Sequence, residues 1–208
     1  SDTAITPSVG SYTSGYFTNI NIQNNSVQKS AFGIQAYGVA GPGNGNGLLI
    51  DSNIMTDTSA NSIGLIGIQI IGVDGAVVSN NNIGNLITPV SGGVLPGGIS
   101  IGSQTINSTI SNNIIGPINI SSASSGPVGI SINTGNANSN LIISNNTISG
   151  LNINQAAVLN GITIGGLTGN VLITKNRISD IKNTYVSATS AYGAYAISLG
   201  SSLTAANI

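Results

Sequence analysis

The stretch Val77-Val78-Ser79-Asn80-Asn81-Asn82-Ile83 recurs in variant form along the whole 208-residue chain. Each copy has a β-branched residue, an asparagine three positions later, and an apolar residue two positions after that. We call these six residues the anchor asparagines: Asn25, Asn53, Asn81, Asn113, Asn146 and Asn176. They are 28 to 33 residues apart. A period of about 30 residues along a whole chain is typical of a solenoid.

Apolar residues flank each anchor at fixed distances, counted here from the anchor asparagine of each repeat. Position −3 is always Ile or Val, and position −5 is mostly apolar. This period of two predicts a short strand with one face inward. Position +2 is apolar in every repeat, and position +5 is apolar in the last four. A second short strand is therefore expected beyond a bend at the asparagine.

A third strand is predicted from a Gly-Ile-x-Ile pattern that recurs once per repeat. Its clearest copies are Gly67-Ile68-Gln69-Ile70, Gly98-Ile99-Ser100-Ile101, Gly129-Ile130-Ser131-Ile132 and Gly161-Ile162-Thr163-Ile164. The alternation of apolar and polar residues indicates one buried and one solvated face. We expect the leading glycine to supply an unusual φ at a tight corner.

Three strands per turn of about 30 residues predict an all-β, three-sheet parallel β-helix of about seven turns. Equivalent positions then stack, so the anchors are expected to form an asparagine ladder. Asparagine also tolerates the left-handed conformation that a sharp bend requires. The uniform repeat predicts one domain over 1–208, with a partial first turn at 1–19 and a truncated last turn at 203–208. Asn207 is the expected seventh anchor, and neither end shows a polar cap, so both are expected to continue into further turns or a neighbouring copy.

The composition excludes several classes of function. Only 4% of residues are charged, the net charge is −1, and histidine and cysteine are absent. Such a chain has no electrostatic attraction for nucleic acid, and no apolar run reaches the length of about 18 residues that spans a bilayer. A surface of Ser, Thr, Asn and Gly with almost no Lys or Glu predicts an extracellular or cell-surface location.

The acidic residues are too scattered to predict a catalytic centre. They are Asp2, Asp51, Asp57, Asp74 and Asp180. Glycoside hydrolysis usually needs two carboxyl groups about 5–9.5 Å apart, whereas these occupy different columns or distant turns. We therefore expect no catalytic residues, no cofactor and no metal. Lys29 and Asp57 share position +4 in adjacent repeats and are expected to be neighbours, while Lys175, Arg177 and Lys182 are expected to form a solvated face around Asp180.

Loops of unequal length join the strands, and binding residues commonly lie in such loops. One loop carries the aromatic residues Tyr185, Tyr192 and Tyr195. We expect these rings to pack over loop ends or to contact another chain, and stacking on sugars is the alternative.

The order of Gly-Ile-x-Ile, a loop and Val/Ile-Ser-Asn-Asn-x-Ile resembles the right-handed parallel β-helix of the pectate-lyase-like superfamily. The resemblance covers essentially all of residues 20–208. In that family an asparagine ladder runs along the bend between the second and third strands, which implies this role for the six anchors. The charge-poor, Asn- and Ser-rich form is also similar to repeats of large bacterial secreted surface proteins and adhesins.

These observations predict a non-catalytic structural segment of an extracellular bacterial filament or cell-surface adhesin. It would act as a rigid spacer whose loops make contacts. The expected partners are flanking repeats of the same chain or further copies of it, with surface glycans as another candidate. Two alternatives stay open: a carbohydrate-binding or polysaccharide-degrading β-helix module, and a phage-type fibre or tailspike.

Overall fold

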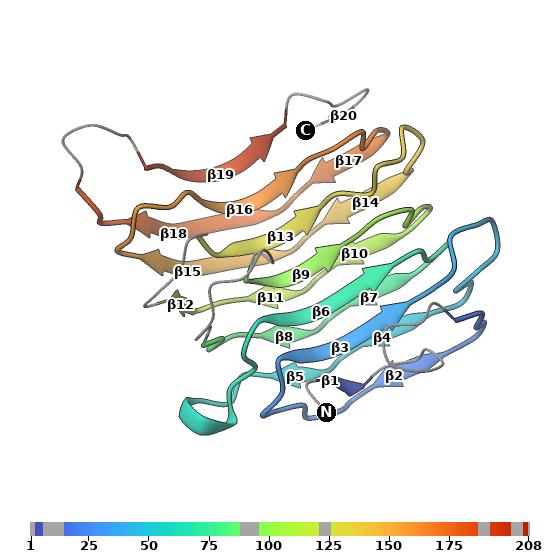
Figure 1. Ribbon diagram of the computed structural model, residues 1–208, viewed down its shortest axis with the longest axis horizontal. Helices are drawn as coiled ribbons and strands as arrows, with labels where there is room; N and C mark the ends of the chain where they lie inside the picture. The colour runs from blue at the N-terminus through green and yellow to red at the C-terminus, as the bar shows by residue number, and fades with distance from the viewer. Residues whose placement is uncertain are drawn as a thin grey trace.

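The computed structural model describes residues 3–5, 15–87, 96–120, 126–186, 192–200 and 206–207. In this part of the chain the strands form three parallel sheets that stack turn upon turn, as Figure 1 shows. The predicted parallel β-helix is thereby confirmed. One 3₁₀ helix, Ser59–Asn61, interrupts the strands. Within these residues, no helix has the length and apolar character needed to cross a membrane.

Each sheet collects one strand from successive repeats. The first sheet has the order β1 (Thr3–Ile5), β3 (Phe32–Tyr37), β6 (Ile66–Ile71), β9 (Gly97–Ile101), β13 (Val128–Ile132), β16 (Leu159–Ile164) and β19 (Ala194–Leu199). The second has β2 (Asn21–Gln23), β4 (Leu49–Asp51), β7 (Val77–Ser79), β10 (Thr109–Ser111), β14 (Leu141–Ser144), β17 (Val171–Thr174) and β20 (Ala206–Asn207). The third contains β5 (Ile54–Met55), β8 (Asn82–Ile83), β11 (Ile114–Ile115), β12 (Ile118–Ile120), β15 (Thr147–Ile153) and β18 (Arg177–Asn183).

Five turns contribute a strand to all three sheets, fewer than the seven expected. Among the described residues, β1 and β2 before these turns, and β19 and β20 after them, extend only the first two sheets. The expectation that Asn207 is a seventh anchor is wrong. Asn207 pairs with Leu172, which lies four positions before the anchor Asn176. The last repeat is longer, with 35 residues between the paired Leu172 and Asn207, so residue spacing alone misplaces the register.

The core consists of stacked columns of branched apolar side chains. Ile34, Ile68, Ile99, Ile130 and Ile162 occupy one register position of the first sheet and are at most 1% exposed. In the second sheet the position −3 residues form an equivalent buried column, which includes Ile50, Val78 and Ile110. Burial of each such side chain contributes about 1.5–3 kcal/mol to folding. The inward pattern predicted from the sequence is confirmed.

The six anchor asparagines form a continuous ladder. In each pair, the backbone N–H and the side-chain Nδ2 of one anchor both donate to Oδ1 of the anchor in the next turn, at 2.9–3.1 Å. The second Nδ2 hydrogen reaches a backbone carbonyl, as from Asn81 to Ile50 O at 2.9 Å. The four middle anchors are fully buried. The ladder therefore satisfies polar groups that would otherwise be costly inside the core.

The left-handed bend residue is not the anchor but the residue before it, which corrects the expectation from the sequence. Position −1 has a φ of 54–56° in all six repeats: Asn24, Ser52, Asn80, Asn112, Asn145 and Lys175. The anchors themselves do not have positive φ. The bend at position −1 turns the anchor side chain inward, where its amide bonds to the neighbouring turns.

Left-handed residues recur every five positions around the ladder. Position −6 also has positive φ in every repeat: Asn19, Gly47, Gly75, Asn107, Asn140 and Asn170. Position +4 has positive φ in four of the six repeats, at Lys29, Asn85, Gly150 and Asp180. Bends at −6, −1 and +4 thus bound the strand of the second sheet and the first strand of the third. Asn, Asp and Gly tolerate this conformation best, which explains their abundance at these positions.

The glycine of Gly-Ile-x-Ile serves close packing rather than an unusual φ, a second correction. None of Gly33, Gly67, Gly98, Gly129 and Gly161 has positive φ. Instead, a Cβ at Gly98 would lie 2.4 Å from Ile115 Cγ2 and 2.8 Å from Gly129 O. A Cβ added at any of the other four glycines would lie 2.4–2.6 Å from the side chain at the equivalent position +2. The missing side chain gives the third sheet room to pack against the first.

Replacing Asn81 with Ala tests the ladder. The change removes the acceptor of two hydrogen bonds from Asn53 and the donors to Ile50 O, Ser79 O and Asn113 Oδ1. Because buried donors and acceptors lose their partners, the free energy of unfolding should fall by about 3 kcal/mol or more. Chemical denaturation measures this change. Asn82→Ala, at the partly exposed neighbour, is the control and should change stability by less than about 0.5 kcal/mol.

Replacing Gly98 with Ala tests the packing role of the glycines. The new methyl group overlaps Ile115 Cγ2, so stability should fall by about 1–3 kcal/mol. Gly165→Ala is the matched control, because a Cβ there meets nothing within 4 Å. Equal thermal stabilities for the two variants would contradict this packing role.

Candidate functional site

The carboxylate of Asp51 lies on the second sheet and accepts hydrogen bonds across two turns. Ser79 Oγ donates to Oδ1 at 2.6 Å, Asn80 Nδ2 donates to Oδ1 at 2.8 Å, and Ser52 Oγ donates to Oδ2 at 2.9 Å. The hydrogen bonds from Ser79 and Asn80 hold the pKa of Asp51 below its ordinary value of 3.8. A carboxylate held ionised by donors in this way is a poor proton donor and acts here as a link between turns.

Asp74 has a similar role at a corner of the solenoid. Its Oδ2 accepts from the backbone N–H of Gly43 at 2.6 Å, and its Oδ1 accepts from Asn107 Nδ2 at 2.7 Å. Asn107 Oδ1 in turn accepts from Asn140 Nδ2 at 3.0 Å. This second set of stacked polar side chains follows the left-handed position −6, which sequence reasoning did not single out.

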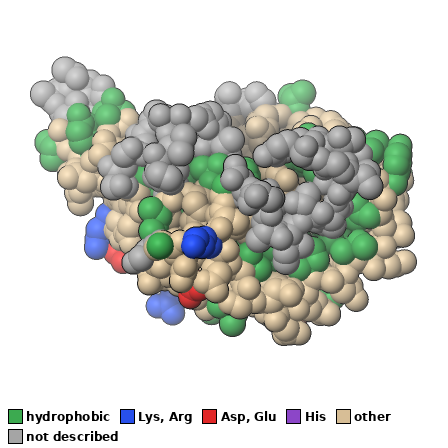
Figure 2. Space-filling view, turned by 60° about the horizontal axis from the view of Figure 1, so that its bottom comes forward, with side chains coloured by type: hydrophobic (Ala, Val, Ile, Leu, Met, Phe, Trp, Pro, Cys, Tyr) green, Lys and Arg blue, Asp and Glu red, His purple; other side chains and the backbone are tan. Residues whose placement is uncertain are grey.

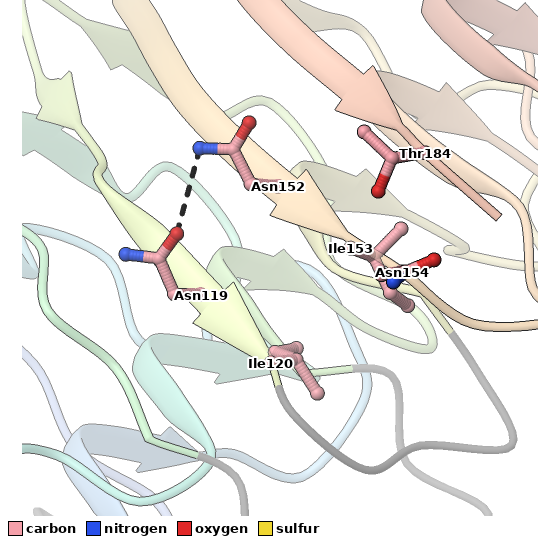
Figure 3. Close-up of a pocket in the computed structure, with 6 residues that line it drawn as sticks. All are labelled: Asn119, Ile120, Asn152, Ile153, Asn154 and Thr184. Carbon is pink, nitrogen blue, oxygen red and sulfur yellow. Dashed lines mark hydrogen bonds between the residues drawn. The ribbon is translucent and has the colours of Figure 1, made fainter.

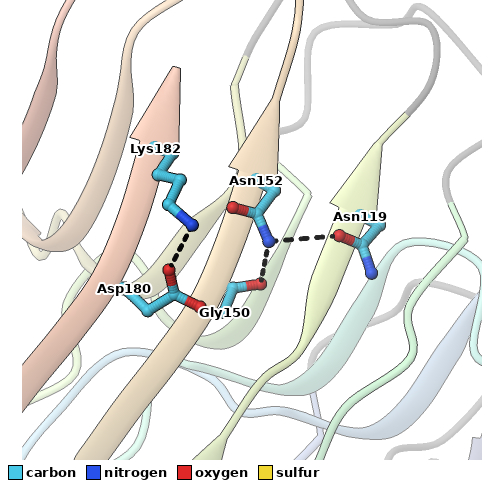
Figure 4. A network of polar contacts seen from close by, with 5 residues as sticks. All are labelled: Asn119, Gly150, Asn152, Asp180 and Lys182. Atoms are coloured by element: carbon cyan, nitrogen blue, oxygen red, sulfur yellow. Dashed lines mark hydrogen bonds and ion pairs between the residues drawn. The ribbon is translucent and has the colours of Figure 1, made fainter. Parts of the chain in front are cut away.

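The third sheet carries the one ion pair found among the described residues. Lys182 Nζ lies 2.8 Å from Asp180 Oδ1 on β18, and both side chains are more than half exposed. Lys175 and Arg177 are exposed as well, so the predicted solvated face is confirmed. Figure 4 shows this pair beside Asn152 on β15 and Asn119 on β12. An exposed pair of this kind contributes little to stability.

The register that was expected to make Lys29 and Asp57 neighbours is shifted in the structure. Both residues are described, and they form no ion pair. The backbone N–H of Lys29 instead donates to Asn61 O. The segment around the 3₁₀ helix Ser59–Asn61 loops away from the stack, so equal distance from the anchor does not give equal position. Ile63, rather than Thr58, then supplies the buried side chain after this loop.

A shallow groove runs along the third sheet near its end and has a volume of about 270 Å³. It is lined by Asn119, Ile120, Asn152, Ile153, Asn154 and Thr184. Figure 3 shows the amides of Asn119 and Asn152 on adjacent strands, with Thr184 beyond Asn154. Asn152 Nδ2 donates weakly, at 3.4 Å, to both Asn119 Oδ1 and Gly150 O. The groove therefore offers neutral amide and hydroxyl groups above a floor of two isoleucines.

A smaller hollow of about 140 Å³ continues along the same face. Thr58, Ser62, Asn85, Leu86, Ile87 and Asn119 line it. Asn119 borders both hollows, so the two form a row along the solenoid axis. Asn119 and Asn152 both occupy position +6, one position beyond the strand columns that the sequence alignment used. Extending the alignment by one column would have revealed them.

Of the three tyrosines Tyr185, Tyr192 and Tyr195, the first two are in ring contact. Tyr185 and Tyr192 form an edge-to-face pair with ring centroids 5.6 Å apart. Tyr195 lies on β19, pairs in register with Asn160, and is 48% exposed. Tyr185 remains 39% exposed in this pair, which leaves part of its ring available for a contact. Tyr185 follows Thr184 of the groove directly in the chain.

The chemistry available on these faces is hydrogen bonding by neutral groups. The outward column of the first sheet is Gln35, Gln69, Ser100, Ser131, Thr163 and Ser198. Gln35 Nε2 donates to Gln69 Oε1 at 2.6 Å. Among the described residues, no three His, Cys, Asp or Glu side chains gather in a group that could hold a metal ion. The groove is consequently the best candidate for binding a ligand.

The pKa of Asp51 gives a test of its role between turns. A carboxyl group whose folded pKa is lowered stabilises the fold above its unfolded pKa, near 3.8, and this contribution is lost as the pH falls through the folded pKa. Ser79→Ala removes the largest cause and should raise the pKa of Asp51, as measured by carboxyl NMR titration. Ser111→Ala, in the same column one turn further on, should leave it unchanged. An unaltered Asp51 titration in Ser79→Ala would contradict this assignment.

Comparison with known proteins gives no family for this chain. No family model, no curated protein and no solved structure matches it. Of what the sequence resemblance implied, the structure shows the parallel β-helix and its asparagine ladder. Activity and biological context have to be argued from the geometry described above.

Proposed function

We propose that this chain is a non-catalytic structural segment of an extracellular bacterial filament or cell-surface adhesin. Its role is that of a rigid spacer, in which stacked turns carry mechanical load and loops make contacts. The observation that carries the proposal is the continuous hydrogen-bonded ladder of six asparagines, which ties six successive repeats together and whose four middle members are buried in the core.

The acidic side chains support a structural role. The carboxylates of Asp51 and Asp74 accept hydrogen bonds from neighbouring turns, and Asp180 pairs with an exposed lysine. A general acid or nucleophile needs a carboxyl group free to face a substrate. These three are instead engaged with the scaffold.

The surface supports an extracellular setting. Only nine residues of 208 are charged, four basic and five acidic. Figure 2 shows one face on which charged side chains are few and scattered among uncharged ones. Such a surface depends on hydroxyl and amide groups for its hydration, which is the composition expected of the secreted surface repeats that the sequence resembles.

A second candidate function rests on the groove of the third sheet. The amides of Asn119 and Asn152 and the hydroxyl of Thr184 could hydrogen-bond a neutral oligosaccharide lying along the solenoid axis. In a surface adhesin, binding of this kind would complement the spacer role. It would occur on the same scaffold and require no change in the core.

Single-molecule pulling on the ends of the chain tests the spacer role. Because adjacent turns are tied by the ladder and by three sheets, we expect unfolding in discrete steps. Each released turn of about 30 residues should add roughly 100 Å of contour length. Asn81→Ala should lower the unfolding force, whereas the control Asn82→Ala should not. Smooth extension at low force would contradict a load-bearing role.

A polysaccharide panel separates the rival functions. Product release that is abolished by Asp51→Asn or Asp74→Asn would overturn the non-catalytic proposal. Binding without turnover, weakened by Asn119→Ala together with Asn152→Ala but not by Ser131→Ala on the first sheet, would assign the groove as a carbohydrate site.

A further inference from the structure

An apolar stripe runs along the outward face of the second sheet at position −4. The register places these residues side by side in successive turns: Asn21, Leu49, Val77, Thr109, Ile142, Leu172 and Asn207. Val77, Ile142 and Leu172 are 39%, 40% and 42% exposed, and Leu49 is half-buried. We call this column the −4 stripe. Nothing in the described part of the chain covers these three exposed side chains.

The −4 stripe has nearly the same residue order from either end. Asparagine stands at both ends, leucine comes next, a β-branched apolar residue follows, and Thr109 lies at the centre. A twofold interface requires such self-complementarity, because residue i of one copy must meet residue j of the other and the reverse. We infer that this face binds the same face of a second copy of the chain, with the two solenoid axes antiparallel and the twofold axis at Thr109.

In this arrangement each apolar residue meets an apolar residue. Leu49 lies opposite Leu172 of the second copy, Val77 lies opposite Ile142, and Thr109 lies opposite Thr109. Both stripes have the same spacing of about 4.8 Å per turn. The contacts therefore stay in register along the interface, as the facing sheets of a steric zipper do.

The neighbouring outward column allows the two faces to approach closely. Position −2 has only small hydroxyl residues from the third repeat onward: Ser79, Ser111, Ser144 and Thr174. The same twofold axis places Ser79 opposite Ser144 and Ser111 opposite itself. Small side chains here leave the −4 stripe as the most prominent part of the face.

The charges select the antiparallel orientation. Asp51 lies in the second repeat and Lys175 in the sixth, both at the edge of this face. The antiparallel arrangement brings Asp51 of one copy beside Thr174 and Lys175 of the other. In the described structure Lys175 is exposed and forms no ion pair. A parallel twofold arrangement would instead keep Asp51 and Lys175 of the two copies four turns apart, so it would not form this pair.

This inference does not depend on the proposed spacer function. A catalytic or carbohydrate-binding β-helix could pair in the same way, and a spacer could function as a single column. Pairing depends on the outward face of the second sheet and its edge, and the groove on the third sheet stays open in either case.

Cysteine cross-linking tests the geometry directly, because the chain contains no native cysteine. Thr109→Cys should form a disulfide-linked dimer under mild oxidation. A mixture of Val77→Cys and Ile142→Cys should cross-link the two variants, whereas Val77→Cys alone should not link to itself. Self-linking of Val77→Cys without the mixed product would overturn the antiparallel arrangement.

Sedimentation equilibrium with matched variants tests the energetics. Ile142→Ser should weaken dimerisation about tenfold or more, whereas Ile114→Ser should leave it unchanged. Ile114 is a suitable control because it is also an outward isoleucine, 51% exposed, on the third sheet. Lys175→Asp should weaken the dimer severalfold, while Lys29→Asp, at the other left-handed lysine, should not. A monomeric wild-type chain at all concentrations, or equal effects of Ile142→Ser and Ile114→Ser, would overturn the inference.

Discussion

The structure depends on the hydrogen bond from each anchor asparagine to the next. An amide is well suited to this task because it carries two donors and an acceptor, so one side chain can bond to the turn before it and the turn after it. From Asn53 onward each Oδ1 accepts twice, and each Nδ2 also reaches a backbone carbonyl. An apolar residue at these positions would leave a buried backbone N–H without a partner. The ladder thus fixes both the path of the bend and the alignment of successive turns.

Two further constraints follow from this bend. A left-handed residue must precede each anchor, and others stand five positions to either side, so the chain turns at regular intervals. The glycine of Gly-Ile-x-Ile then leaves space for the position +2 side chain, which lies just past the bend. Bend, ladder and glycine are therefore parts of one arrangement. A change at any of them is transmitted to the packing between the first and third sheets.

The outward faces differ in character although they share a scaffold. The first sheet presents uncharged polar residues, the second an apolar stripe beside small hydroxyl residues, and the third an amide-lined groove beside an ion pair. A solenoid permits this because the inward positions and the bends determine the fold, whereas the outward positions of the strands can vary. The same scaffold can consequently combine load bearing, pairing with a second copy and contact with a ligand.

The repeat, the three strands per turn, the inward columns and the six anchors can be predicted from the sequence alone. These features are local or strictly periodic, and stacking converts equal spacing into equal position. The three-dimensional structure was needed to show which residue is left-handed, why Gly98 is glycine, and where Asn207 lies. It also gave Lys29 a backbone partner at Asn61 and brought Asn119, Asn152 and Thr184 together. Wherever a loop changes length, residue spacing no longer gives position, because the path of the loop decides which side chains meet.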